Sequence, residues 1–200
     1  MQKTQRTNVA RAAVVAVSLS LLSGIFSFAQ ETPKPQKSKP EYIQATAEGT
    51  STQLGRMAEV TIIINEYSTA DDQKVLIQAF EEKKNEGLNH ALDKMKAKGR
   101  IAITGTLGYD LNYIRQFQMP DGSRKIRFVT DRPITFGEAW SSSRSMDYSL
   151  SGGEVTFSKE KGKSSGTLLP ACEFKLDKEK HLEIEALQNP WKLLNIMVRN

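Results

Sequence analysis

The segment Gly99–Phe128, GRIAITGTLGYDLNYIRQFQMPDGSRKIRF, decides the fold class. Apolar and polar residues alternate along Arg100–Leu107 with a period of two, which is typical of a strand with one buried face. A second alternating stretch has Leu111, Tyr113, Phe117 and Met119 on one side and Asn112, Gln116 and Gln118 on the other. Met119–Arg124 contains Pro and Asp-Gly, which favour a chain reversal. Ile126 and Phe128 continue the alternation on the returning strand, so the segment predicts an antiparallel hairpin.

Upstream of this segment, the sequence predicts two strands and then a helical region. The strands lie around Ile43–Ser51 and Met57–Tyr67, and β-branched residues are frequent in the second. Ser68, Thr69 or Asp71 can cap the start of a helix. Two apolar helical faces follow: Val75, Leu76, Ala79 and Phe80, then Leu88, Ala91, Leu92 and Met95. The two faces are out of phase on one ideal helix and Gly87 lies between them, so we expect a helical pair or a kinked helix.

Downstream, the pattern predicts further strands. Cys172–Leu176 and Leu182–Leu187 form a second hairpin candidate, and Pro190–Val198 is an apolar strand suited to a covered position. Shorter extended pieces are expected around Ile134–Trp140, Met146–Leu150 and Glu154–Ser158. The expected fold class is therefore α+β: a curved antiparallel sheet or partial β-barrel, connected as a meander, with an inserted helical pair.

The first 40 residues have the composition of an export leader and a tether. Residues 1–29 combine three basic residues, an apolar stretch and small residues before Gln30, which predicts a signal peptide. Residues 30–40 are rich in Pro and Lys and predict a disordered linker, followed by a single domain over residues 41–200. We expect a soluble periplasmic or secreted protein that meets the membrane only during export.

Charge gives no indication of a nucleic-acid partner. The whole chain has 28 Lys+Arg and 23 Asp+Glu. The leader contains three of the basic residues and no acidic one, so the mature chain has 25 against 23, a net charge of +2. A charge this small does not provide the basic surface that nucleic-acid binding requires.

Cys172 is the only cysteine, so an intramolecular disulfide is excluded. Its position near the C-terminus also excludes a lipid anchor, which needs an N-terminal cysteine after cleavage. Cys172, Phe174 and Leu176 share one side of an extended chain, opposite Glu173 and Lys175. We therefore expect the thiol to point into the core and to act as a small apolar side chain.

The densest polar cluster lies within Arg127–Tyr148. Asp131, Glu138 and Asp147 are the candidate catalytic residues, because paired carboxylates can perform general acid–base chemistry. Candidate ligand-binding residues, able to hold an anion or stack on one, are Arg132, Arg144, Trp140 and Tyr148. The alternative is structural: Asp131 caps backbone amides near Pro133, and the arginines pair with the neighbouring acids.

Established catalytic and metal-binding motifs are not found. The two histidines, His90 and His181, are not part of an H-E-x-x-H pattern, and the chain has no G-x-S-x-G motif. The sequence thus predicts no metal and no cofactor.

Four segments resemble motifs of a family of exported bacterial proteins that has no assigned activity: GRIAITGTLGYDLNYIRQF, IRFVTDRPITFGEAW, RSMDYSLSGGEV and NPWKLLNI. The resemblance covers most of the chain, from about Met57 to Val198. It implies an exported protein, and it provides no catalytic residue.

Three hypotheses about function follow. The first is a non-catalytic protein that binds a small apolar or anionic ligand or an envelope protein. The second is a hydrolase that uses the carboxylates of the Asp131–Asp147 cluster. The third is a structural or interaction module of the cell envelope, which an exposed apolar patch around Trp140 would favour.

Overall fold

The expected hairpin is present in the computed structural model, where β5 (Tyr113–Gln118) pairs antiparallel with β6 (Arg124–Thr130). The structure describes residues 39–134, 148–176, 178, 182–186 and 190–199. All of these lie in one unit of the chain, Lys37–Asn200. The predicted leader and most of the predicted linker therefore lie outside the described residues.

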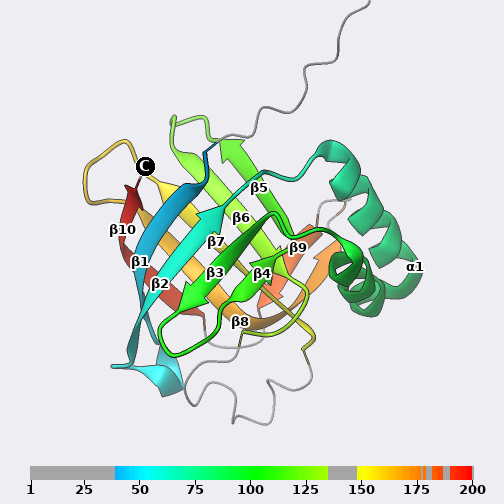
Figure 1. The fold of residues 1–200 in the computed structure, drawn as a ribbon, viewed down its shortest axis with the longest axis horizontal. Coiled ribbons are helices and arrows are strands. Elements are labelled where there is room, and N and C mark those ends of the chain that lie inside the picture. The colour runs from blue at the N-terminus through cyan, green and yellow to red at the C-terminus, as the bar shows by residue number, and fades with distance from the viewer. Residues whose placement is uncertain (1–38, 135–147, 177, 179–181, 187–189, 200) are drawn as a thin grey trace, which may run out of the picture. The chain divides into compact units, whose positions relative to one another are not determined.

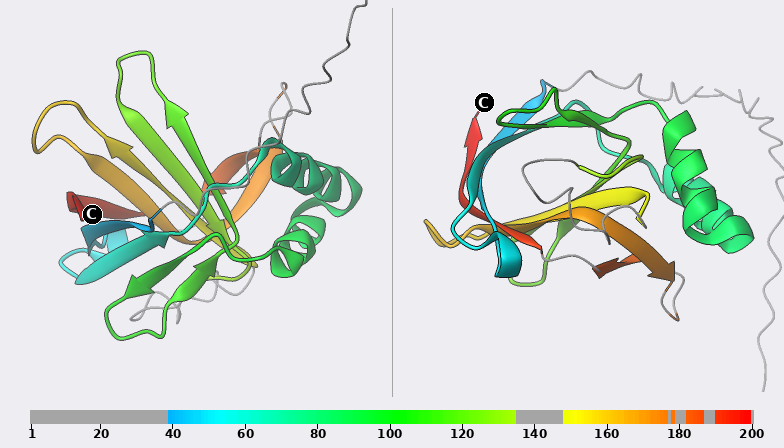
Figure 2. Two further views of the ribbon diagram at one scale, coloured as in Figure 1. Left: turned by 45° about the horizontal axis from the view of Figure 1, so that its top comes forward. Right: turned by 90° about the horizontal axis from the view of Figure 1, so that it is seen from below.

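The described strands form one antiparallel sheet that curves into a nearly closed barrel (Figures 1 and 2). Its other strands are β1 (Glu41–Glu48), β2 (Met57–Ile64), β3 (Gly99–Ile103), β4 (Tyr109–Leu111), β7 (Leu150–Phe157), β8 (Ser165–Leu176), β9 (Leu182–Ala186) and β10 (Trp191–Arg199). A short 3₁₀ turn, Ser51–Gln53, connects β1 to β2. The strand order is β4-β3-β2-β1-β10-β8-β7-β6-β5, and β9 pairs with the second half of β8.

This order shows a meander with one insertion. Consecutive strands are neighbours from β1 to β4 and from β5 to β8, but β10 lies between β1 and β8. The hairpin expected from Cys172–Leu176 is the pair β8–β9, which runs from Cys172 opposite Ala186 to Leu176 opposite Leu182. The C-terminal strand therefore has a central position in the sheet, but only Trp191 and Leu193 of it are buried, and Met197 and Val198 are exposed.

A bend at Asn112 nearly closes the sheet. β4 and β5 stand at opposite ends of the strand order, yet only Asn112 separates them in the chain. Its backbone amide donates to the carbonyl of Val129 in β6, at 3.1 Å. One bent segment, Tyr109–Gln118, thus belongs to both edges of the sheet.

The bend also determines which side chains of β5 point inward. Ile114 is fully buried in the barrel interior, whereas Phe117 on the other face is 38% exposed. The expectation that Tyr113 and Phe117 lie on the inward side with Leu111 is wrong, because the alternation restarts after the buried Asn112. The first strand is also shorter than expected: β3 ends at Ile103, and Thr104–Gly108 form a turn.

Buried side chains form two clusters. The larger cluster fills the barrel with inward-facing residues of most strands, including Ile62, Ile101, Phe128 and Leu193. The smaller lies outside the barrel, between the helix and the outer face of β6–β8, and consists of Leu76, Phe80, Leu88, Leu92, Val129, Leu150, Leu169, Cys172 and Phe174. The helix is therefore attached to the convex side of the sheet.

The structure shows one helix, α1 (Ala70–Lys94), in place of the expected helical pair. It is inserted between the paired strands β2 and β3 and starts with a capping box formed by Thr69 and Asp72. The helical geometry is interrupted at Lys83 and Lys84, and Lys84 has φ 51° and ψ −138°. The interruption lets both apolar faces, which are out of phase on an ideal helix, contact the same sheet.

An ion pair connects the two sides of the barrel at one end. Arg124 of β6 donates to both carboxylate oxygens of Glu41 in β1, at 3.0 and 2.5 Å, and Tyr67 donates to the same carboxylate at 2.9 Å. Three strands separate β1 from β6 in the sheet order. Burial raises the pKa of Glu41, but the hydrogen bonds from Arg124 and Tyr67 outweigh it, so the pKa lies below its usual value of 4.5.

This ion pair is expected to make stability depend on pH. Because the pKa of Glu41 is lower in the folded state, its contribution is full above about pH 4.5 and is lost as the pH falls through the folded value. Glu41→Gln should lower the free energy of unfolding by about 1–2 kcal/mol at pH 7. It should also reduce the decrease in this free energy that the wild type shows between about pH 5 and about pH 3. Urea unfolding at a series of pH values measures both effects. Asp71→Asn, at an exposed position of the helix start, is the control, and equal pH profiles for the wild type and Glu41→Gln would contradict the assignment.

Candidate functional site

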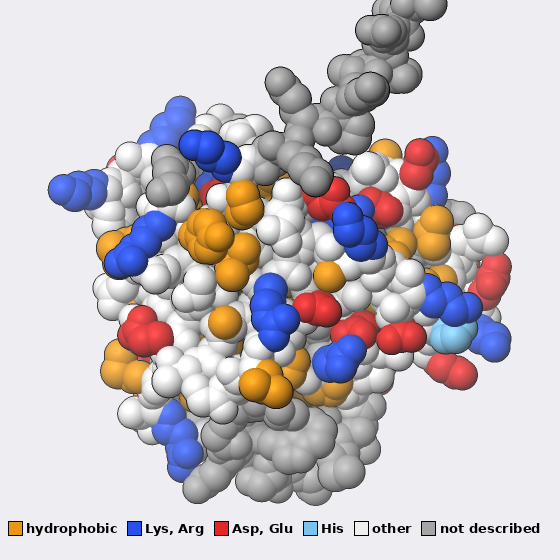
Figure 3. Space-filling model, in the orientation of Figure 1, with side chains coloured by type: hydrophobic (Ala, Val, Ile, Leu, Met, Phe, Trp, Pro, Cys, Tyr) orange, Lys and Arg blue, Asp and Glu red, His pale blue; other side chains and the backbone are white. Residues whose placement is uncertain are grey.

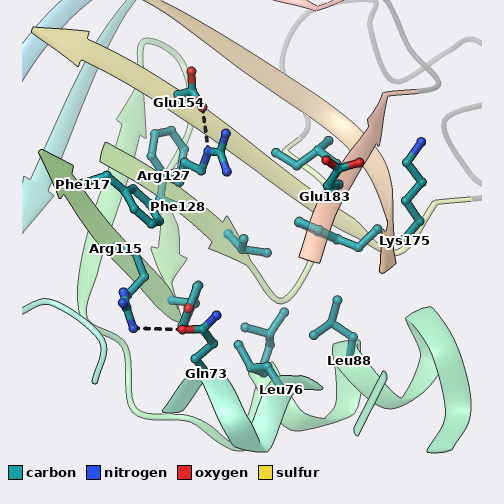
Figure 4. A pocket seen from close by; sticks show the side chains of 15 residues that line it. Gln73, Leu76, Leu88, Arg115, Phe117, Arg127, Phe128, Glu154, Lys175 and Glu183 are labelled. Carbon is teal, nitrogen blue, oxygen red and sulfur yellow. Dashed lines mark hydrogen bonds and ion pairs between the residues drawn. The ribbon is translucent and has the colours of Figure 1, made fainter. Parts of the chain in front are cut away.

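A cavity of about 650 Å³ lies between α1 and the outer face of the sheet, and Phe128 of the barrel cluster also lines it (Figure 4). One wall comes from α1, through Leu76, Leu88 and Leu92. The opposite wall comes from β6, β8 and β9, through Val129, Phe174 and Ile184. Aliphatic and aromatic side chains therefore face each other across the cavity, and charged side chains lie at its edge.

Three asparagines fix the second half of α1 against the sheet. Asn85 pairs with the backbone of Phe174, accepting from its amide at 2.8 Å and donating to its carbonyl at 3.1 Å. β7 pairs with β8 only as far as Cys172. Phe174 lies beyond this pairing, and its backbone amide and carbonyl bind the side chain of Asn85 instead. Asn89 donates to the carbonyls of Asp131 and Ser149, at 2.5 and 3.0 Å.

Asn112 makes the third attachment. Its side-chain amide donates to the carbonyls of Leu92 and Met95 at the C-terminal end of α1, at 3.1 and 3.4 Å. The carbonyl of Leu92 also accepts from the amide of Met95 at 2.9 Å, and carbonyls at the end of a helix commonly need such additional donors. The residue that bends β4 into β5 thus also positions the helix wall of the cavity.

The mouth of the cavity is built by a row of charged residues on neighbouring strands. In register across the sheet, Arg115 of β5 lies opposite Arg127 of β6, and Arg127 lies opposite Glu154 of β7. Arg127 donates to Glu154 at 2.7 Å, and Arg115 donates to Gln73 of α1 at 3.2 Å. Figure 4 shows Phe117 beside both arginines at this edge. The guanidinium carbons of Arg115 and Arg127 lie 6.0 and 5.6 Å from the centre of its ring.

Two pKa shifts describe this edge. Burial raises the pKa of Glu154, but hydrogen bonds from Lys125 and Arg127 outweigh it, so the pKa lies below its usual value and the carboxylate is ionised at neutral pH. Burial raises the pKa of Tyr113, which lines the cavity beside Arg115, so its hydroxyl stays protonated. The edge of the cavity therefore has a negative charge at Glu154 and a neutral hydrogen-bond donor, the hydroxyl of Tyr113.

Three of the predicted site residues lie within the described part of the chain. Asp131 is buried at the end of β6 and accepts two hydrogen bonds from Arg132, at 2.9 and 2.8 Å. Tyr148 is half-buried just before β7. Neither these two residues nor Arg132 is among the residues that line the cavity. Glu138, Trp140, Arg144 and Asp147 lie outside the described residues, so their catalytic and binding roles stay predictions.

The prediction for Cys172 is confirmed: it is free and fully buried, in the cluster beneath α1. Burial, helped by the charge of Glu173, raises the pKa of its thiol to about 12. At neutral pH the thiol is protonated and acts as an apolar group.

Sequence reasoning missed the cavity residues. Arg115 and Phe117 share one face of β5, and this alternation is the available signal in the sequence. An inward position for Phe117 conceals it, and Arg127 joins these residues only through the pairing of β5 with β6.

Comparisons with known proteins yielded no match, whether to family models, to curated proteins or to solved structures. Within the described residues, no cluster of three or more His, Cys, Asp or Glu side chains could hold a metal ion. No helix among the described residues combines the length and the apolar composition that a membrane span requires.

Proposed function

We propose that this chain is an exported, non-catalytic protein that binds a small apolar molecule in the cavity between α1 and the outer face of β6, β8 and β9. The observation that carries the proposal is the cavity itself: about 650 Å³, with apolar walls and a few polar groups at one edge. Ligand sites in proteins typically have this size and composition. The leader pattern of residues 1–29 supports the export part of the proposal.

The attachment of the helix supports a preformed site. Leu76, Leu88 and Leu92 are buried, and the three asparagines connect α1 to four separate segments of chain. Walls held in this way do not have to be ordered by the ligand, so less binding energy is lost on association. Acidic and basic side chains are interspersed over the face seen in Figure 3, which fits a small-molecule ligand better than a nucleic acid.

The test uses Nile red, a neutral apolar dye whose fluorescence rises in apolar surroundings. The full chain is expected to bind it saturably. Ile184→Trp places a large ring in the cavity and should weaken binding at least about tenfold, because the ring occupies the space of the dye. Gln73→Trp makes the same test from the helix wall if the first variant folds poorly by circular dichroism.

Met197→Trp is the matched control, since Met197 is 56% exposed on β10 and does not line the cavity. It should bind Nile red as the wild type does. Absence of saturable binding, or equal binding by the wild type and both cavity variants, would overturn the proposal.

A further inference from the structure

The second half of β10 has one edge without a partner strand. β10 pairs with β8 only over Trp191–Leu193, whereas its pairing with β1 continues to Arg199. The last pair with β8 joins Leu193 to Gly166, and β8 begins one residue earlier, at Ser165. Among the residues that the structure describes, no strand therefore binds the other edge of β10 beyond Leu193.

A bulge at Asn195 bends this part of β10 away from its neighbour. The register between β1 and β10 shifts between Gln44 and Thr46, and Asn195, which lies within the shift, has φ 51°. A bulge of this kind bends the strand that contains it. Figure 2 shows the end of β10 turning away from the hairpin of β7 and β8. The end of β10 is therefore separated from the strands that would otherwise continue the sheet.

The side chains at this edge do not protect it. Monomeric proteins commonly protect an exposed strand edge with lysine, proline or an inward-pointing charge. Ile196–Val198 contains none of these. Met197 is 56% exposed and Val198 is 42% exposed, and Tyr42, on the neighbouring strand β1, is 41% exposed. An unpaired edge with exposed apolar side chains favours pairing with a strand of another chain.

A second copy of the same strand matches this edge. In an antiparallel pair with a two-fold axis at Met197, Met197 lies opposite Met197 of the other copy. In the same register Ile196 lies opposite Val198, and Asn195 lies opposite Arg199. Apolar pairs across two strands stabilise a sheet, and like charges opposite each other destabilise it. This register has apolar pairs at its centre and no like charges in opposition, so the strand is complementary to itself, as a two-fold interface requires.

We propose that two copies of this chain associate by antiparallel pairing of Ile196–Arg199 of β10, which joins their sheets across a two-fold axis at Met197. Met197 and Val198 do not line the ligand cavity, so the dimer forms whether or not that cavity binds a ligand. The paired segment is short, and we expect a weak, concentration-dependent dimer of the kind that small interfaces form.

Sedimentation equilibrium of the full chain between about 10 and 500 µM tests the proposal, because this range covers weak and transient interfaces. The wild type should show a monomer–dimer equilibrium. Met197→Lys and Met197→Glu each place two like charges in opposition at the two-fold axis, so each should raise the dissociation constant of the dimer at least about tenfold. An equimolar mixture of the two variants places Lys opposite Glu, and it should associate at least about tenfold more tightly than either variant alone.

Leu107→Lys is the control, because Leu107 is 94% exposed in the turn between β3 and β4. It should dimerise as the wild type does, and circular dichroism should show that all three variants fold. A wild type that stays monomeric over the whole range would overturn the proposal. Unchanged association of both Met197 variants, or no recovery in their mixture, would overturn it as well.

Discussion

The Asn112→Asp variant is expected to be less stable than the wild type by about 3 kcal/mol or more at pH 7. Asn112 is only 4% exposed, and its side-chain amide donates to the carbonyls of Leu92 and Met95. A carboxylate would place negative oxygen against these two carbonyl oxygens in a site that water does not reach. The variant must therefore bury an unpaired charge or take up a proton, and both cost free energy.

A comparison with Asn112→Ala separates the charge from the lost hydrogen bonds. The alanine variant should lose about 1–3 kcal/mol at any pH, because the carbonyls of Leu92 and Met95 each lose the hydrogen bond from the side chain of Asn112. The loss of stability in Asn112→Asp should become smaller as the pH falls towards about 4 and be smallest below it, because burial raises the pKa of the carboxyl and its protonated form can donate one bond. Urea unfolding at pH 7 and at low pH measures these differences. Wild-type stability of Asn112→Ala would contradict the role of Asn112 at the helix end, and equal stability of the two variants at pH 7 would contradict the cost of the buried charge.

Phe128→Ala is expected to lower the free energy of unfolding by about 3–5 kcal/mol. Phe128 is the largest fully buried side chain of the barrel interior, and its ring lies directly over Gly153 of β7. A Cβ atom at Gly153 would meet the ring at 2.4 Å, and Gly153 itself has no side chain that could fill the space that the truncation leaves. The loss of stability therefore has two sources: the apolar area that is no longer buried and the empty space that the missing ring leaves in the barrel.

Phe117→Ala is the matched control, because it changes the same residue type on the partner strand of the same hairpin. Phe117 is 38% exposed at the mouth of the cavity, and its truncation should cost less than about 1 kcal/mol. Urea unfolding followed by far-ultraviolet circular dichroism gives both values. Similar losses in the two variants would contradict the division into an inward and an outward face.

The sequence predicts the sheet well because period-two alternation is a local property. The antiparallel pairing, the hairpin β8–β9 and the burial of Cys172 all follow from residues that are close in the chain. The expected break in the helical region also follows, although the structure places it at Lys83 and Lys84 and keeps one helix.

Closure of the sheet and the cavity depend on contacts between residues distant in sequence. Asn112 contacts Leu92 and Val129, and Asn85 contacts Phe174, which is 89 positions away. No local pattern identifies such partners. Of the candidate site predicted from the density of polar residues, Asp131, Arg132 and Tyr148 lie within the described residues, and they do not line the cavity. Density of charged residues is a property of the sequence, whereas the cavity mouth depends on the register of three strands.

A crystal structure of the full chain grown with Nile red tests the central claim most directly. The account predicts the dye between α1 and the outer face of β6, β8 and β9. Dye inside the barrel, or a cavity that stays without it at a saturating concentration, would contradict the claim that this protein binds its ligand between α1 and the outer face of the sheet.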